Sequence, residues 1–296
     1  MTHKIRSGKR RSKEDIIFDS IVYIIIILIC MATILPCMQV LTISLSPNEV
    51  AGKYGLHLFP VKISLEGFKK VLDYPLIWTS YGNTITRSLL GTFITQVLLV
   101  LGAYPLAKPY LPNRKLWTIL IIFTMYFSGG IVPDYLLVVK YLKLKNTIWS
   151  MVLPGAVNAY TLIIVRNFFE GIPASLEESA RIDGASEMKI LMSIVLPLSK
   201  PVLATTSLWS LVYHWNSWFD CMLYIPDQSK YVLQMVLRNI LIQGQIQDVG
   251  AAAAGAVNNE TMKMATLVVS VIPIIAIYPF LQKYFVQGVM VGAVKE

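Results

Sequence analysis

The chain has 296 residues, of which 55% are hydrophobic and only 15% are charged, whereas roughly a quarter of the residues in an ordinary soluble domain are charged. Its net charge of +9 comes from basic residues spread through the loops and the N-terminal tail without a nucleic-acid-binding module, so lipid headgroups explain it better than nucleic acid does. The three cysteines and three histidines lack the spacing of a disulfide framework or a metal site. These totals exclude an ordinary soluble domain and favour a membrane protein.

Six long apolar runs are each able to cross the ~30 Å hydrocarbon core of a bilayer as a helix. We expect the corresponding spans at about 16–45, 77–107, 116–139, 146–166, 200–222 and 264–285. A chain in lipid must satisfy its own backbone hydrogen bonds, and the alternating pattern of barrel strands is absent. The predicted fold class is therefore an all-α membrane protein, with a basic tail at 1–15 and one transmembrane domain at 16–296.

The basic N-terminal tail sets the expected orientation of the spans. It carries six Lys and Arg residues, and the run Ile21–Leu45 beyond it has 25 uncharged residues without a cleavage site, so we interpret the first span as a retained anchor. The positive-inside rule then places the N-terminus in the cytoplasm, and six spans return the C-terminus to the same side. The basic connection 108–115 agrees with this orientation. The turn that contains Lys140, Lys143 and Lys145 fits it less well, because it would lie outside.

The connection between the fourth and fifth spans has the local signals of a helix, a turn and a second helix. Ser175 stands three residues before Glu178, a capping-box pattern that predicts a helix beginning at Ser175. Gly184 permits a sharp change of direction, and Ser186 can cap a second helix that Pro197 ends. The second helix would present one apolar face, formed by Met188, Leu191, Met192 and Val195. We therefore expect an amphipathic helix-turn-helix at 173–197.

The spacing within this connection resembles the EAA loop, E-A-A-x3-G-x9-I-x-L-P, of the membrane subunits of ATP-binding-cassette (ABC) importers. Its fixed positions are filled here by Glu178, Ser179, Ala180, Gly184, Ile194, Leu196 and Pro197. Ser179 in place of Ala is the only departure from that pattern. The segment WNSWFD and the ending QKYFVQGVMVGAVKE are similar to the carbohydrate-uptake branch, the maltose-type permeases of type I importers, although Glu296 replaces a more usual small residue.

The resemblance covers nearly the whole chain from the first span onward and implies a transport subunit rather than an enzyme. Such importers combine two permease subunits, a dimer of nucleotide-binding subunits and an extracellular solute-binding protein in the bacterial cell membrane. By resemblance, this chain is the multi-pass permease that translocates a carbohydrate, an oligosaccharide rather than a monosaccharide, and pairs with a different but related permease. The chain lacks the GxxxxGK[ST] phosphate loop and binds no cofactor by this interpretation; ATP and Mg belong to the ATPase partner.

The resemblance also assigns the coupling to the ATPase subunit to the first helix of the loop, which docks in a cleft of that subunit. Glu178 would make a polar or ionic contact, Ala180 would allow close approach and Gly184 would supply the turn. Arg181 and Asp183 either add charge contacts or form solvated surface. The coupling residues that we predict are Glu178, Ser179, Ala180, Arg181, Asp183 and Gly184.

Aromatic and amide side chains in and near the spans suggest a path for the solute, because aromatic rings stack on the C–H faces of sugars and amides bond their hydroxyls. The candidate residues are Asn83, Asn158, Tyr213, Trp215, Asn216 and Trp218. An interfacial aromatic belt is the alternative for Tyr213 and Trp218, and interior packing is the alternative for the amides. Arg87 is costly in lipid, so it faces the interior and pairs with a neighbouring helix, lines the path or meets a carboxylate of the companion permease.

Two alternative functions are compatible with parts of the sequence. A permease for a solute other than a sugar would share the EAA loop, but WNSWFD and the C-terminal tail argue against it. An intramembrane enzyme or a signalling subunit should show paired carboxylates, a Ser-Lys or His-Asp arrangement, or a metal set within the spans, and none is evident. The outer loop 224–263 corresponds in position to the segment that reaches into the solute-binding protein in maltose-type permeases.

Overall fold

The computed structural model describes residues 13–51, 55–243 and 260–293, and all regular structure in these ranges is helical. This confirms the all-α fold class. Most of the expected basic tail 1–15 and the middle of the expected outer loop 224–263 lie outside the described residues. The chain divides into two compact units, Met1–Val71 with Ala252–Val269 and Leu72–Ala251 with Ser270–Glu296.

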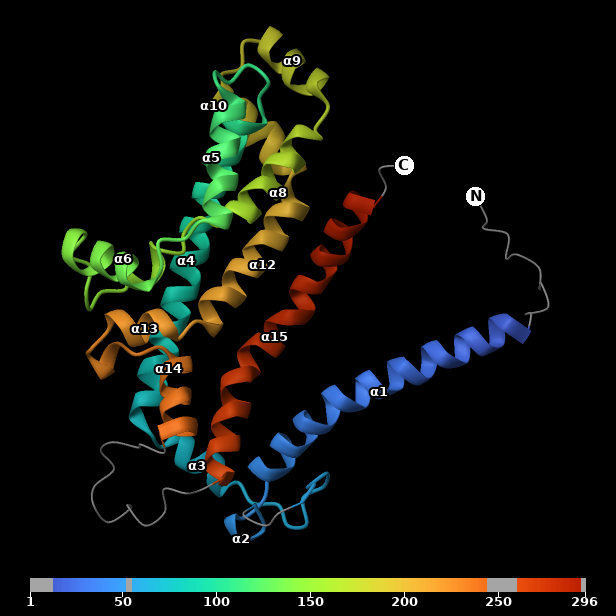
Figure 1. The fold of residues 1–296 in the computed structure, drawn as a ribbon, viewed down its shortest axis with the longest axis vertical. Helices are drawn as coiled ribbons and strands as arrows, with labels where there is room; N and C mark the ends of the chain where they lie inside the picture. The colour runs from blue at the N-terminus through green and yellow to red at the C-terminus, as the bar shows by residue number, and fades with distance from the viewer. Residues whose placement is uncertain (1–12, 52–54, 244–259, 294–296) are drawn as a thin grey trace. The chain divides into compact units, whose positions relative to one another are not determined.

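The first unit contains the long apolar helix α1, Lys13–Ser44 (Figure 1). Most of its apolar side chains are exposed, which suits a helix surrounded by lipid. Two short helices follow, α2 at Asn48–Ala51 and α3 at Glu66–Leu72, and the unit also holds the start of α15, Glu260–Ala293. A Cβ on Gly67 would lie 2.7 Å from Cγ2 of Thr261, so the absence of a side chain at Gly67 allows α3 and α15 to pack closely.

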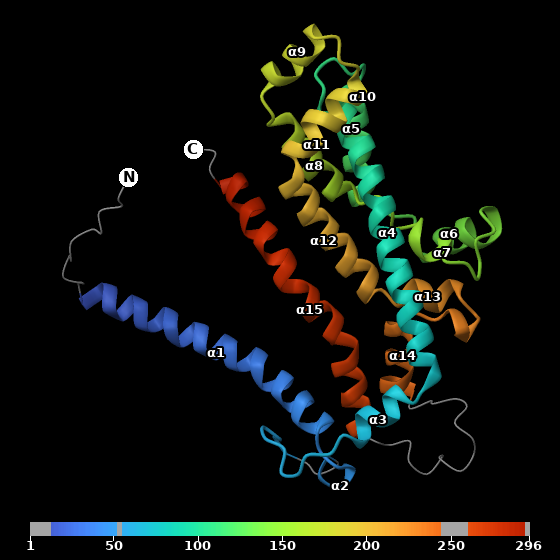
Figure 2. The ribbon, with the colours of Figure 1, turned by 180° about the vertical axis from the view of Figure 1, so that it is seen from behind.

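The second unit is built around α4, Pro75–Ala107, whose first turn holds Pro75 where a missing N–H costs nothing. Helices α8, Ala159–Glu170, and α12, Lys200–Asn216, pack along α4, as both views of the ribbon show (Figures 1 and 2). One apolar core joins these helices to the loop that precedes α12. Its buried members include Leu99, Ala103, Leu162, Val165, Phe169, Ile190, Leu191 and Val195.

Three of the expected spans do not run as single straight helices, and one of them, 200–222, is divided between α12 and a short helix at Phe219–Tyr224. The segment 116–139 holds α5, Arg114–Tyr126, and α6, Ile131–Leu136 with a π-helical turn at Leu137–Tyr141, and the two parts are bent by 108°. Gly130, with φ +87°, and Pro133 explain this break. The segment 146–166 is split in the same way between α7, Trp149–Val152, and α8, because Pro154 and Gly155 interrupt it.

Three helices among the described residues are long and apolar enough to cross a membrane: Lys13–Ser44, Pro75–Ala107 and the part Glu260–Ile277 of α15. The number rises to five if each of two bent helix pairs forms one span, α5 with α6 and the pair on either side of Ser199. The remaining expected span, 146–166, contains only short helices; α8, with 12 residues, is about 18 Å long.

The connection between α8 and α12 forms the expected helix-turn-helix, with one difference at its start. Helix α9 spans Ala174–Ile182 and begins one residue before the predicted Ser175, so the predicted capping box is wrong. Pro173 occupies the N-cap position with φ −56°, which leaves Ser175 inside the first turn, where its hydroxyl cannot cap. No side-chain cap bond forms at this end of α9.

The second half of the connection confirms the predicted cap at Ser186, whose hydroxyl accepts a bond from the backbone N–H of Lys189. Helix α10, Glu187–Ile190, continues through a π-helical turn at Leu191–Val195 into α11, Leu196–Leu198. The chain then bends by 80° into α12. The helix therefore ends one residue after the predicted stop at Pro197.

Beyond α12 the chain forms a series of short elements before the undescribed segment. Helix α13 spans Phe219–Tyr224, a 3-10 turn spans Gln228–Lys230 and α14 spans Leu233–Arg238, followed by a π-helical turn at Asn239–Gln243. Helix α14 packs against α4. The 3-10 turn, α14 and the π-helical turn lie within the expected outer loop 224–263, whereas α13 precedes it.

Candidate functional site

The turn between α9 and α10 is closed by the backbone arrangement that commonly ends a helix with glycine. The N–H of Gly184 bonds the carbonyl of Arg181 at 3.0 Å, and the N–H of Ala185 bonds the carbonyl of Ala180 at 2.9 Å. Gly184 has φ +81°, and a Cβ there would meet no atom within 4 Å. Its backbone conformation, rather than crowding, therefore requires glycine, in agreement with the predicted turn.

The predicted coupling residues fall on two sides of α9. Glu178, Ser179, Asp183 and Gly184 are exposed, and Ile182 beside them is 87% exposed. No ion pair of Glu178 occurs within the described part of the chain. Ala180 and Arg181 are partly buried, and Ala180 packs against the apolar core. Helix α9 thus presents one free face with a carboxylate and a large apolar side chain, while its other face is attached to the unit.

A buried ion pair attaches that second face, and sequence reasoning missed it. Glu177, only 7% exposed, is paired with Lys108, which lies directly after α4 and is 6% exposed. Arg181 lies 3.5 Å from the same carboxylate. Adjacent residues of a helix differ in direction by about 100°, so Glu177 can face the unit while Glu178 faces outward. The sequence pattern alone does not show which of the two glutamates is internal.

Further contacts extend this pair into a cluster of six residues. Arg181 donates to Glu187 Oε1 at 2.9 Å and to the hydroxyl of Tyr110 at 3.0 Å, while Tyr104 donates to Glu187 Oε2 at 2.7 Å. The ammonium of Lys108 lies 4.3 Å from the centroid of the Tyr104 ring. We call these residues the charge cluster: Tyr104, Lys108, Tyr110, Glu177, Arg181 and Glu187.

The contacts of the charge cluster shift the pKa values of Glu187 and Tyr110. The hydrogen bond from Arg181 holds the pKa of Glu187 below its usual range. Burial, followed by the hydrogen bond to Glu187, raises the pKa of Tyr110, so its hydroxyl stays protonated. The cluster contains two basic and two acidic side chains.

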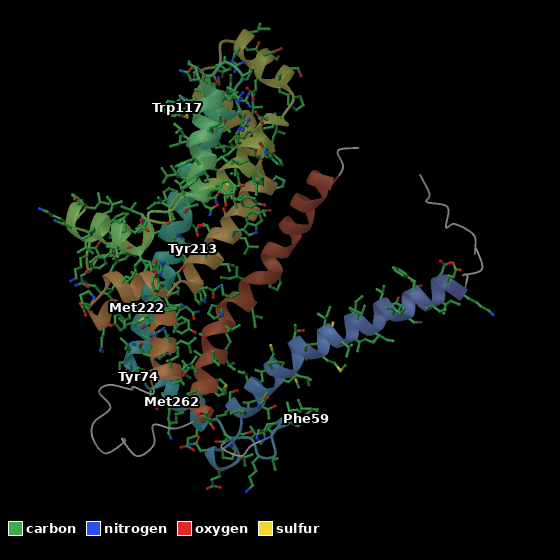
Figure 3. All side chains as sticks on the ribbon, viewed as in Figure 1. Phe59, Tyr74, Trp117, Tyr213, Met222 and Met262 are labelled. Carbon is green, nitrogen blue, oxygen red and sulfur yellow. The ribbon has the colours of Figure 1, made fainter. Side chains whose placement is uncertain are left out.

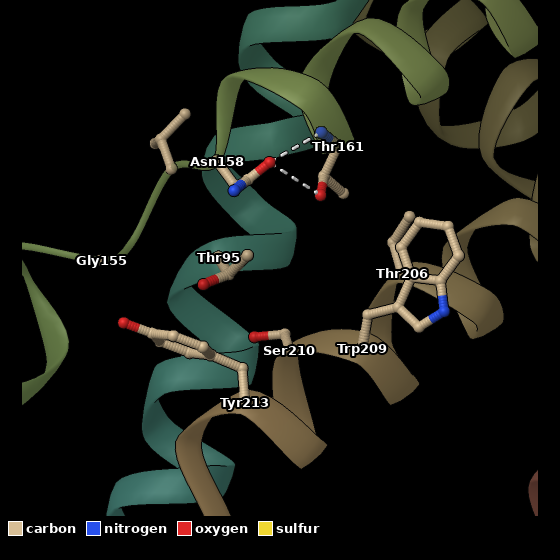
Figure 4. Close-up of a pocket in the computed structure, with 9 residues that line it drawn as sticks. Thr95, Gly155, Asn158, Thr161, Thr206, Trp209, Ser210 and Tyr213 are labelled. Atoms are coloured by element: carbon tan, nitrogen blue, oxygen red, sulfur yellow. Dashed lines mark hydrogen bonds between the residues drawn. The ribbon is translucent and has the colours of Figure 1, made fainter. Parts of the chain in front are cut away.

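A cavity of about 260 Å³ lies between α4, the start of α8 and α12. Its lining combines hydroxyl groups, one amide and two aromatic rings, and the residues are Thr95, Gly155, Val157, Asn158, Thr161, Thr206, Trp209, Ser210 and Tyr213. Figure 4 shows the side chains of Thr95, Asn158, Ser210 and Tyr213 around a common space. Figure 3 places Tyr213 on α12 where that helix lies along α4.

Some polar groups that line this cavity have hydrogen-bond partners within the described part of the chain, and others have none there. The hydroxyls of Thr95 and Ser210 are buried and have no hydrogen-bond partner among the described residues. The Asn158 side-chain oxygen caps α8 by accepting from the N–H of Thr161 at 3.0 Å, and also accepts from the Thr161 hydroxyl at 3.2 Å. Unpartnered buried hydroxyls are unfavourable unless water or a polar ligand bonds them, so the cavity is suited to a hydroxylated molecule.

The profile of a protein family described as "Binding-protein-dependent transport system inner membrane component" matches residues 81–291, which include the charge cluster and the cavity. The chain belongs to this family. The resemblance to importer permeases that the loop spacing indicated is thereby confirmed. This membrane component has close relatives over nearly its full length. Protein LplC of Bacillus subtilis is 41% identical over 89% of this chain and 90% of its own length.

This membrane component is also similar to a second bacterial permease and to chains of two solved transporter structures. The polygalacturonan/rhamnogalacturonan transport system permease protein YtcP of Bacillus subtilis is 37% identical over 94% of this chain and 98% of its own length. A chain of a bacterial ABC transporter that imports the acidic polysaccharide alginate matches with a TM-score of 0.87 and 33% identity, covering 94% and 100% of the two chains. A chain of the alginate transporter in complex with a pentasaccharide-bound periplasmic protein shares the fold at a TM-score of 0.64 and 15% identity.

Arg87 of this membrane component is 0% exposed and pairs within its own chain. Its guanidinium forms an ion pair with Asp220 and donates to the carbonyls of Ser217 at 3.0 Å and Met151 at 3.2 Å. Of the alternatives set out for Arg87, pairing with a neighbouring segment is therefore the one observed. The pair joins α4 to the first turn of α13.

The other residues predicted to line a solute path lie away from the cavity. Asn83 donates to the carbonyls of Ser229 at 2.9 Å and Tyr231 at 3.0 Å. Trp215 is buried and donates to the carbonyl of Ser270 at 3.4 Å, while Arg238 lies 4.6 Å from the centroid of the Trp218 ring. Asn216 is exposed. The structure thus brings Asn158 and Tyr213 together and places Asn83, Trp215, Asn216 and Trp218 elsewhere.

Sequence reasoning missed the hydroxyl residues of the cavity. Thr206 and Ser210 are spaced by four residues on α12, so they share one face of that helix, and Thr95 faces them from α4. Small polar residues at helical spacing in an apolar span are a usable signal, but it identifies a face and not the neighbour that completes the cavity.

Proposed function

We propose that this chain is the membrane-spanning permease subunit of an ATP-driven ABC importer that translocates an oligosaccharide delivered by an extracellular solute-binding protein. The observation that carries the proposal is α9, a short helix with a free face that ends in the Gly184 turn and is fixed on its other face by the charge cluster. The names of the relatives support a saccharide as the solute, and two of them concern acidic polysaccharides.

In this proposal the free face of α9 docks on a nucleotide-binding subunit. Glu178 supplies the ionic contact and Ile182 inserts as an apolar anchor. Ala180, which we expected to allow close approach, packs against the apolar core instead, so the exposed Ser179 takes that role. Asp183 is exposed and adds charge at the rim, whereas Arg181 serves within the charge cluster. ATP and Mg are held by the ATPase dimer, and this chain contributes no cofactor site.

The proposed membrane arrangement has six spans with both termini in the cytoplasm of a bacterial cell. It counts α5 with α6 and α7 with α8 as one broken span each, beside α1, α4, α12 and α15. Non-helical backbone at membrane depth is tolerated where protein covers it or water fills a cavity, and a companion permease could provide such cover. The loop 173–197 then faces the cytoplasm, and the loop 224–263 faces the solute-binding protein.

We assign the cavity beside α4, α8 and α12 to the proposed path of the sugar. Its volume of about 260 Å³ is just below that of typical ligand pockets, which hold roughly 300–1,000 Å³, so it would contact one ring of a longer chain. Tyr213 and Trp209 offer ring faces, and the hydroxyls of Thr95 and Ser210 offer unused hydrogen bonds. Asn158 and the exposed Asn216 remain proposed contacts, whereas the partners of Asn83, Trp215 and Trp218 favour packing roles for these three.

Reconstituted transport tests the proposal. The permease, its companion, the ATPase subunits and the solute-binding protein are placed in proteoliposomes, and ATP-dependent uptake of labelled neutral and uronate oligosaccharides is measured. We expect Glu178→Ala and Gly184→Pro to abolish uptake, because a lost partner of a desolvated ion pair costs about 3–5 kcal/mol and proline cannot adopt a positive φ. Glu66→Gln, which alters an exposed pair with Lys70, is the matched control.

The outcomes separate the parts of the proposal. Normal uptake by both loop variants would exclude α9 as the joint to the ATPase. Uptake of an amino acid or another solute without a sugar would replace the proposed cargo while keeping the importer. Catalytic activity of the chain purified alone would overturn the transport function itself.

A further inference from the structure

Helix α9 is attached to the rest of its unit mainly through charged and hydroxyl groups. Of its side chains, Ala180 reaches the apolar core, while Glu177 and Arg181 make the ionic contacts. The partners of these two residues are Lys108 and Tyr110 beside the end of α4, and Glu187 at the start of α10. The charge cluster therefore decides which other element α9 follows when it moves.

The pair between Lys108 and Glu177 is the most deeply buried part of this attachment. Both residues are more than nine-tenths buried. Separating them would leave two charges out of water and without a partner, which is strongly unfavourable. Helix α9 and the end of α4 are therefore expected to move together rather than to slide past each other.

The connection from α9 to α12 is softer, although it is covalent. It passes the Gly184 turn, the π-helical turn Leu191–Val195 and the 80° bend at Ser199 before α12 begins. Turns of this kind are places where helices change direction, because their backbone hydrogen bonds are incomplete or rearranged. A displacement of α9 can be absorbed along this route.

Helix α4 leads from the charge cluster to the cavity and beyond. Thr95 on α4 lines the cavity, and Arg87, farther along the same helix, is clamped to Asp220. A tilt of α4 driven at Lys108 would move the Thr95 wall of the cavity relative to the α12 wall that carries Ser210. Helix α4 is continuous from Arg87 to Ala107, with Pro105 in its last turn, and Lys108 follows it directly.

We propose that the Lys108–Glu177 pair is a positioning element that makes α4, rather than α12, the helix that moves with α9. The inference rests on the proposed function, since it concerns how a displacement of α9 by an ATPase subunit reaches the cavity. Lys108 and Glu177 touch neither nucleotide nor solute; they act by holding α9 on α4.

Distance measurements between spin labels test the proposal on the unaltered pair. Cysteines are introduced at the exposed positions Ser175 on α9, Leu101 on α4 and Lys200 on α12, in chains whose native cysteines are replaced by alanine. In the complete importer in proteoliposomes, we expect the separation of 175 and 101 to stay the same between nucleotide-free and ATP-bound states. The separation of 175 and 200 should change. The opposite pattern would overturn the proposal.

Variants of the pair supply the functional test. Lys108→Met should lower uptake by about tenfold or more while ATP hydrolysis continues, because α9 still docks but no longer carries α4. Lys108→Arg, which keeps the charge, should restore most of the uptake. The matched control is Lys70→Met, which removes one partner of an exposed pair with Glu66 at 2.9 Å.

The failure of this inference is distinguishable from the failure of the proposed function. If the chain is not an importer subunit, the unaltered assembly shows no ATP-dependent uptake of any oligosaccharide. If only the inference is wrong, the unaltered assembly transports and Lys108→Met transports equally well, or uptake and hydrolysis fall together. A Lys108→Met chain that fails to assemble leaves the spin-label measurement on the unaltered pair to decide.

Discussion

Removing the carboxylate of Asp220 should destabilise this permease more than removing the guanidinium of Arg87. Arg87 is 0% exposed, and among the described residues only the carbonyls of Met151 and Ser217 would still meet its charge. Asp220→Ala therefore leaves a buried unpaired cation, at a cost of about 3–5 kcal/mol. The Asp220 side chain is 22% exposed and also accepts from the N–H of Cys221, so Arg87→Met should cost less, roughly 1–3 kcal/mol.

The native thiol of Cys221 can report the difference in stability between Asp220→Ala and Arg87→Met. Cys221 is buried beside Asp220, whereas Cys30 and Cys37 are exposed and can be replaced by alanine. Heating the purified permease with a thiol-reactive dye then gives an unfolding temperature from the exposure of Cys221. Asp220→Ala should melt lowest, and the double variant with Arg87→Met should melt above it, because the buried cation is gone. Equal melting of the two single variants, or additive losses in the double variant, would refute the reasoning.

Two further predictions concern the core of α4 and the pH dependence of the loop. A Cβ on Gly91 would clash with the imidazole of the buried His214, so Gly91→Ala should cost about 1–3 kcal/mol in the same melting assay. A Cβ on Gly82 would meet nothing within 4 Å, so Gly82→Ala should be neutral or slightly stabilising. A melt of Gly91→Ala at or above that of Gly82→Ala would contradict this. Because Arg181 lowers the pKa of Glu187 below its ordinary 4.5, their contact stabilises the loop at neutral pH and is lost as the pH falls through that lowered value. Amide hydrogen exchange in α9, corrected for its intrinsic pH dependence, should accelerate as the pH falls through the lowered pKa of Glu187 but not in Glu187→Gln. Equal pH dependence in both chains would exclude the effect.

Local signals in the sequence predicted much of the α9–α10 loop because its geometry is set by neighbouring residues. Gly184 at a positive φ and the Ser186 cap depend on short-range backbone preferences, and both were found. The start of α9 was misplaced because Pro173 fixes its own φ and takes the cap position from Ser175. A competition between two local signals is difficult to resolve from the sequence alone.

Local sequence patterns could not predict contacts between residues that are far apart in the chain. Arg87 and Asp220 are far apart in the chain, and so are Lys108 and Glu177; only the packing of the helices decides these partners. The cost of an unpaired charge in lipid does predict that Arg87 has a partner, but not which one. Composition likewise located the apolar segment 116–139 without showing that Gly130 and its neighbours break it.

The π-helical turn at Leu191–Val195 marks the place where the helix after the Gly184 turn can take in a residue without turning its two ends. A π turn holds about one more residue than the α-helical turn it replaces, so each completes about one revolution. Deleting one residue within this turn would restore α-helical hydrogen bonding, and the helix on either side would keep its direction. Deleting one residue from the α-helical part, Glu187–Ile190, would instead rotate everything that precedes it by about 100°, and Glu178 would face a different side of the molecule. The length of this helix is therefore constrained before the π turn and tolerant of change within it.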